Sequence, residues 1–167
     1  MNLVEEGVDV GVRIAHLKDS SLVAKSVGQV RRVVCASEQY LRRHGIPKVP
    51  SDIRKHRCVC HLGLVSPSEW PFRTGKRNVT IPVASVLTSN EIDSAINACI
   101  SGLGVGMFLS YMIAPYRISG EVRYVLEQFE PDPIPIQVIY SNSKLLSSKV
   151  RAFVDESAAK LKQVKLD

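Results

Sequence analysis

The chain has few aromatic residues, no long apolar run and no leader-like start. Aromatic side chains make up 6% of its 167 residues, so a core must depend on Val, Ile, Leu and Ala. The apolar stretches are far shorter than the roughly 20 residues of a membrane-spanning helix. Met1 leads into Glu5 and Glu6 instead of a basic and then apolar stretch, so no signal peptide is predicted. We expect a cytoplasmic globular protein without a membrane partner.

Cysteine is also scarce, and its spacing does not favour a metal site. The four cysteines lie inside apolar runs: Cys35, Cys58, Cys60 and Cys99. On a strand, Cys58 and Cys60 share one face while His61 lies on the other, so only two ligands of a zinc site would face the same side. We therefore predict reduced, buried thiols, no metal and no cofactor.

The positive charge is scattered. The formal net charge is +6 and the isoelectric point is about 9.3, a balance that is common among nucleic-acid-binding proteins. The basic residues occur in short pairs: Arg31-Arg32, Arg42-Arg43, Arg54-Lys55 and Lys76-Arg77. No aromatic residues are interleaved with them, and no helix-turn-helix or zinc-finger spacing is present. A solvated basic surface is the interpretation that we prefer.

Short β-rich runs alternate with helical periods, so the predicted fold class is α/β. Strands are expected at 8–14, 21–27, 30–36, 57–62, 83–88, 105–109, 122–126 and 134–140, with a hairpin-like pair between 70 and 81. Ser37 should cap a short helix that Gly45 closes. Asn90 should cap the clearest helix, on which Ile92, Ala95, Ile96 and Cys99 share one face. A last amphipathic helix carries Val150, Phe153, Val154 and Leu161 on its apolar side.

The glycines at 102, 104 and 106 could suggest a phosphate-binding loop. A dinucleotide motif needs a strand before the glycines and a helix after them, whereas here a helix precedes and a strand follows. Helix termination and close backbone packing explain these glycines better. Catalysis has little support either, because no Gly-x-Ser-x-Gly elbow and no paired acids facing an apolar pocket occur.

Several segments, taken in order, match motifs that occur together in one protein family. Residues 3–14 look like "L-x-x-G-x-D-x-A-I-R", residues 35–47 like "A-S-P-x-Y-L-x-x-H-G-x-P", Asn90 with residues 98–106 like "N-…-A-x-x-G-L-G-I-A", and residues 120–126 like "G-x-L-V-x-V-L". Residues 148–155 resemble that family's terminal helix. Each segment alone is weak evidence, but the ordered set covers most of the chain and resembles the effector-binding domain of LysR-type transcriptional regulators.

The resemblance implies a two-lobed type 2 periplasmic-binding-protein-like fold. Residues 1–30 and 141–167 would form a partial lobe I, and residues 31–140 would form lobe II. Family members carry a winged helix-turn-helix, a linker helix and a first strand-helix-strand ahead of the point where this sequence starts, so lobe I is expected to be incomplete. DNA would be contacted only through that winged helix-turn-helix, and the domain would form a homodimer or a higher homo-oligomer.

Ligands of open α/β sheets bind beyond the carboxyl ends of the strands. The predicted effector-binding residues follow three strands: Ile14, Ala15 and His16; His61, Leu62 and Gly63; Ser89 and Asn90. Free amides at the start of the Asn90 helix favour an anion, although Glu91 opposes it. For His16 and His61 an ordinary polar loop position is the alternative.

We therefore predict an effector-sensing domain of a bacterial LysR-type regulator that binds a small anionic metabolite between two lobes and transmits this to a DNA-binding domain. A transport-type solute-binding protein of the same fold is the alternative, and an enzyme on this fold is a third reading with the least support. A helix-turn-helix encoded upstream would favour the first, and a signal peptide the second.

Overall fold

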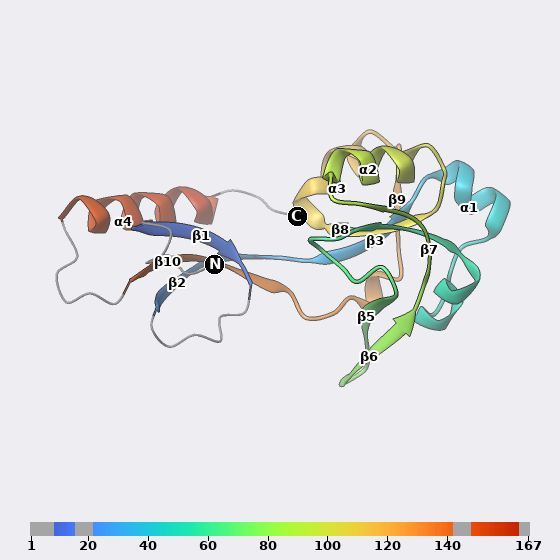
Figure 1. The fold of residues 1–167 in the computed structure, drawn as a ribbon, viewed down its shortest axis with the longest axis horizontal. Coiled ribbons are helices and arrows are strands. Elements are labelled where there is room, and N and C mark those ends of the chain that lie inside the picture. The colour runs from blue at the N-terminus through green and yellow to red at the C-terminus, as the bar shows by residue number, and fades with distance from the viewer. Residues whose placement is uncertain (1–8, 16–21, 142–147, 164–167) are drawn as a thin grey trace. The chain divides into compact units, whose positions relative to one another are not determined.

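The computed structural model describes residues 9–15, 22–141 and 148–163 (Figure 1). The chain divides into two compact units. Unit 1 combines the segment that ends at Val30 with the segment that begins at Pro133, and unit 2 spans Arg31–Asp132. Both units mix helices with sheets, so the predicted α/β class is confirmed.

Unit 1 is a three-stranded antiparallel sheet with one helix against it (Figure 1). Its elements are β1 Val10–Ile14, β2 Leu22–Val30, β10 Ile134–Ser141 and α4 Ser148–Gln163. Among the α4 side chains that the structure describes, Val154 and Ala158 are buried, at the i and i+4 spacing of one helix face. Phe153 is 56% exposed, so the apolar side predicted for this helix is wider than its buried face.

The strand around Ile136 does not belong to the second lobe, where the sequence reading placed it. β10 lies between β1 and β2, with Val138 opposite Val12 on one side and opposite Lys25 on the other. Val138 is fully buried. The apolar pattern of β10 identifies a strand correctly, but it carries no information about which sheet supplies the partners.

Unit 2 is built on a five-stranded mixed sheet in the order β7-β4-β8-β3-β9. Its strands are β3 Arg32–Ala36, β4 Arg57–His61, β7 Ala84–Ser89, β8 Val105–Leu109 and β9 Arg123–Val125, and β5 Glu69–Thr74 pairs with β6 Arg77–Pro82 as a separate hairpin. The helices are α1 Glu38–His44, α2 Ile92–Ile100 and α3 Ser110–Ile118, with 3-10 turns η1 Pro50–Lys55 and η2 Glu127–Phe129. β4, β7 and β8 run parallel, and β3 runs antiparallel to β8 and β9.

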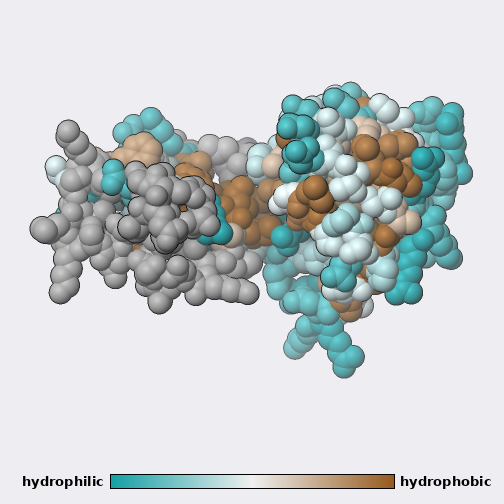
Figure 2. All heavy atoms as spheres, in the orientation of Figure 1, coloured by the Kyte–Doolittle hydropathy of each residue, from teal (hydrophilic) through white to brown (hydrophobic). Residues whose placement is uncertain are grey.

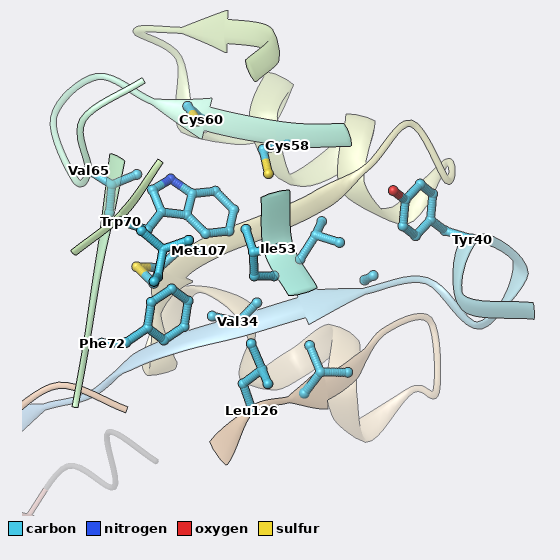
Figure 3. Packing of buried hydrophobic residues seen from close by; sticks show 14 of the residues in the cluster. Val34, Tyr40, Ile53, Cys58, Cys60, Val65, Trp70, Phe72, Met107 and Leu126 are labelled. Carbon is cyan, nitrogen blue, oxygen red and sulfur yellow. The ribbon is translucent and has the colours of Figure 1, made fainter. Parts of the chain in front are cut away.

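The sheet of unit 2 has an apolar core on each face. Alternation along the strands produces both cores: Val34 and Ala36 of β3 enter one cluster, while Val33 and Cys35 enter the other. The first cluster also holds Trp70, Phe72, Ile53 and Met107 (Figure 3). The second lies under α2, which buries Ala95, Ile96 and Cys99 as its period predicts.

The local signals at the helix ends were mostly correct. The Tyr40 amide donates to Ser37 Oγ at 3.4 Å, and Gly45 ends α1 with φ of 85°. The predicted cap of α2, Asn90, is wrong. Glu91 occupies the N-cap position, and no side chain caps the helix. Just before the helix, Ser89 Oγ accepts the Glu91 amide in a turn.

Two glycines after α2, Gly102 and Gly104, have the predicted roles of helix termination and close backbone packing. Gly102 adopts φ of 79°, a left-handed conformation that suits glycine at a helix end. A Cβ atom on Gly104 would lie 2.4 Å from the carbonyl oxygen of Arg57, so the backbones of the two segments approach too closely for any side chain. Within the described residues, no helix is long and apolar enough to cross a membrane.

Candidate ligand-binding site

One edge of the unit 2 sheet gathers the ends of its three parallel strands. His61 at the end of β4 lies opposite Ser89 at the end of β7. β8 ends at Leu109, which is paired with Arg32 at the start of the antiparallel strand β3. This edge is therefore where an open α/β sheet would bind a ligand.

Five of the predicted site residues meet at this edge. The Leu62 amide donates to the Ser89 carbonyl at 3.0 Å, and His61 Nε2 lies 3.0 Å from the Asn90 carbonyl oxygen. Gly63 completes the group through its amide, which lies 3.1 Å from His61 Nδ1. The loops after β4 and β7 are thus tied to each other.

The geometry at His61 fixes its tautomer. Nδ1 accepts the Gly63 amide, so the ring proton is on Nε2 and is donated to the Asn90 carbonyl. A Cβ atom on Gly63 would lie 2.9 Å from the Cε1 atom of His61, which explains the glycine. Both ring nitrogens are already used, and this makes His61 a structural tie between two loops.

The remaining predicted residues are in unit 1 or outside the described part. Ile14 ends β1 and Ala15 donates its amide to the Pro135 carbonyl at 3.2 Å, so both belong to unit 1. His16 lies outside the described residues. Ser89 Oγ is occupied by the backbone of Glu91, which it contacts at 2.9 Å and 3.0 Å.

A pocket at this edge has a half-buried cation in its wall. It has a volume of about 220 Å³ and seven lining residues: Arg32, Leu64, Val65, Ser66, Glu69, Pro71 and Thr80. Leu64 and Val65 follow the His61 loop directly, and their amides both donate to the His61 carbonyl. The pocket therefore adjoins the predicted residues but extends toward the β5–β6 hairpin.

Arg32 is unusual because part of its guanidinium group is buried without a partner. Its Nε–H is excluded from solvent and has no hydrogen-bond acceptor in the part of the chain that the structure describes. Burial lowers the pKa of Arg32, although an arginine side chain remains a cation at neutral pH. The neighbouring Arg31, by contrast, forms an ion pair with Glu130 at 3.1 Å. An acceptor brought by a ligand would satisfy the Arg32 group.

Arg32 is not among the residues predicted from the sequence, because the Arg31-Arg32 pair was interpreted as surface charge. A signal was present: Arg32 stands between Val30 and Val33, which are both fully buried, at the start of an apolar strand. Among the described residues, no three His, Cys, Asp or Glu side chains are grouped to hold a metal ion.

Comparison with known proteins agrees with this architecture. The sequence matches the LysR substrate binding domain over residues 1–162. It is 29% identical over 157 residues to the HTH-type transcriptional regulator YcaN of Escherichia coli, covering 93% of this chain and 51% of that protein. It is 30% identical over 156 residues to an HTH-type transcriptional repressor of Pseudomonas aeruginosa, covering 92% and 49%. The chain thus spans about half the length of each relative.

Solved structures show the same fold. The regulatory domain of AphB from Vibrio vulnificus superimposes with a TM-score of 0.81 at 27% identity, covering 96% of this chain and 78% of that one. The regulatory domain of CrgA from Neisseria meningitidis gives 0.76 at 25% identity, covering 95% and 78%. The architecture is that of the periplasmic-binding-protein-like regulatory domains, and the chain belongs to the LysR substrate binding domain family.

Proposed function

We propose that this chain is the effector-sensing part of a bacterial transcription regulator, and that its effector presents a carboxylate to Arg32. Family membership supports the first statement, since the relatives are named as HTH-type transcriptional regulators. It favours a regulator over a transport protein and over an enzyme. The regulator would act in the cytoplasm as a homo-oligomer and contact DNA through its helix-turn-helix domain.

The buried Nε–H of Arg32 is the observation that carries the ligand proposal. A guanidinium offers a planar set of donors that matches a carboxylate, and the half-buried Arg32 side chain is part of the pocket wall. Ser66 and Thr80 add hydroxyl groups to the same wall, and Leu64 and Pro71 add apolar surface. Glu69, an exposed residue of the rim, favours a ligand with a hydroxyl or amino group beside the carboxylate.

The proposal revises the site predicted from the strand ends. His61, Leu62, Gly63, Ser89 and Asn90 support the loops, and Arg32 makes the contact with the anion. That Ile14, Ala15 and His16 of unit 1 bind the effector stays a prediction.

A ligand screen by thermal unfolding tests this function. A panel of small 2-hydroxy, 2-amino and unsubstituted carboxylic acids would be added to the chain while the fluorescence of Trp70, the single tryptophan, is recorded. We expect some of these acids to raise the melting temperature of the native chain and to leave the melting temperature of Arg32→Gln unchanged. Arg77→Gln removes an exposed cation outside the pocket and should respond like the native chain. Equal responses of Arg32→Gln and the native chain would contradict the assignment.

A further inference from the structure

A second pocket of unit 2 shares no residue with the Arg32 pocket. It has a volume of about 420 Å³, within the range of small-molecule sites. Nine residues line it: Ile46, Pro47, Lys48, Arg123, Tyr124, Val125, Leu126, Glu127 and Gln128. The first three connect α1 to η1, and the others extend from β9 into η2, so the pocket lies along the edge strand of the sheet.

The α1–η1 rim of this pocket is held rigidly. Asp52 accepts the amides of Lys48 at 2.9 Å and Val49 at 3.1 Å, and these hydrogen bonds lower its pKa. Pro47 and Pro50 further restrict the connector. A rim that is already ordered loses little conformational freedom when a ligand binds.

The opposite wall bends sharply at Leu126. This residue adopts φ of 61°, which is uncommon for a non-glycine side chain, while its side chain stays 5% exposed in the core cluster. Figure 3 shows Leu126 in the core around Val34. The bend lets the chain leave β9 and turn into η2 while it still lines the pocket.

The charges of the lining favour a monoanion. Lys48 and Arg123 are cations and Glu127 is an anion, so one positive charge remains. Glu127 is already paired with Arg117 at 4.0 Å, and Arg123 lies 3.8 Å from Glu38. Lys48 has no ion-pair partner among the described residues, so its ammonium group is available to an anion. An ammonium without a carboxylate beside it is the natural contact for the charged end of a ligand.

The surrounding surface also favours anions. Six cations and a single carboxylate lie between positions 42 and 57, a net charge of +5 against +6 for the whole chain. All six cations are exposed: Arg42, Arg43, Lys48, Arg54, Lys55 and Arg57. Figure 2 shows hydrophilic side chains gathered over the α1 and η1 end of unit 2. Such a field raises the local concentration of anions near the pocket.

Apolar groups supply the other half of the pocket. Ile46 and Val49 on the connector are 45% and 43% exposed, although the segment around them is strongly charged. Ile46 and Pro47 line the pocket on one side. Val125 and Leu126 line it on the other, but their side chains are buried in the core cluster. We propose that this pocket binds a small amphipathic carboxylate, with its charged end at Lys48 and its aliphatic body against Ile46 and Pro47. The proposal does not depend on the function of the Arg32 pocket.

Calorimetric titration of the full chain with octanoate, below its micelle-forming concentration, tests this proposal. We expect octanoate to bind and the neutral octanamide to bind about tenfold more weakly or not at all, as the loss of one charged contact predicts. Lys48→Gln should weaken octanoate by about the same factor. The double variant Lys76→Gln/Arg77→Gln removes two exposed charges that lie outside the pocket and outside residues 42–57, and it should stay within about twofold of the native affinity.

Backbone amide NMR of the chain with the same ligand locates the binding site. Signals of Ile46, Lys48 and residues 123–128 should shift on octanoate addition, and those of residues 64–66 should not. Binding that is lost in Arg32→Gln but kept in Lys48→Gln would place octanoate in the other pocket and overturn the proposal. Equal weakening by the Lys76/Arg77 variant would reduce the effect to the net charge of the chain and overturn the proposal as well, as would no binding at all.

Discussion

The contact between Gly104 and β4 predicts a clear cost for adding one methyl group. In Gly104→Ala the new Cβ would lie 2.4 Å from the Arg57 oxygen and 2.9 Å from the Arg57 carbonyl carbon. An ordinary contact needs about 1 Å more, so the segment before β8 must move away from β4. This strains the parallel pairing of Cys58 with Val105. Overpacking of this kind costs roughly 1–3 kcal/mol, and the stiffer unfolded chain of alanine returns about 0.4–1 kcal/mol.

Urea unfolding followed by tryptophan fluorescence measures this cost. Trp70 is the single tryptophan and is fully buried in unit 2, so its emission reports this unit. We expect Gly104→Ala to lower the free energy of unfolding by roughly 1–2 kcal/mol. Gly75→Asn is the matched control, because no atom lies within 4 Å of its Cβ and asparagine tolerates the φ of 60°. A Gly104→Ala variant as stable as the native chain would refute the close approach.

Four further outcomes are expected. Burial raises the pKa of Cys58 to about 12, so at pH 8 about one thiol in ten thousand is ionised and Ellman's reagent should label it only after unfolding; labelling of the native chain within minutes would argue against this. Burial, and then His44, lower the pKa of His56, so the unfolded state takes up the proton first and the stability of unit 2 should fall between about pH 7 and pH 5; His56→Gln should show a flatter pH profile in urea. Ile96→Asp places a charge at a 3% exposed core position of α2 and should cost several kcal/mol, enough to abolish the circular dichroism of unit 2, whereas Asp93→Ala on the exposed side should not. Phe153 is 56% exposed in unit 1, so the chain should self-associate at high micromolar concentration and Phe153→Ser should shift its sedimentation toward the monomer.

The sequence predicts the local structure well because its signals are local. Strand alternation places Val33 and Val34 in opposite cores, and the same rule separates Cys58 from Val59. Helix ends follow from Ser37 and Gly45, whose side chain and backbone conformation act within one turn. These features depend on neighbours in the chain and need no knowledge of the tertiary contacts.

Pairing between distant segments could not be read in the same way. β10 looks like any other apolar strand, and only its register with β1 and β2 assigns it to unit 1. Phe153 fits the helical period of α4, yet it lies outside the buried strip of Val154 and Ala158. In both cases the pattern identified the element correctly and left its partner undetermined.

The candidate site illustrates the same limit at the level of chemistry. The position of ligands beyond strand ends led to His61 and Asn90, which are neighbours in the structure. Their polar groups, however, are hydrogen-bonded to each other. A histidine with both nitrogens engaged would have to break a hydrogen bond before it could bind a ligand. The free energy of the broken bond offsets much of the free energy gained from the ligand. Arg32 starts from the opposite condition, because its buried Nε–H has no acceptor among the described residues. Arg32, the proposed contact for an anion, thus combines a positive charge with a donor that the fold leaves unsatisfied, and identifying it required the hydrogen bonds of the folded chain.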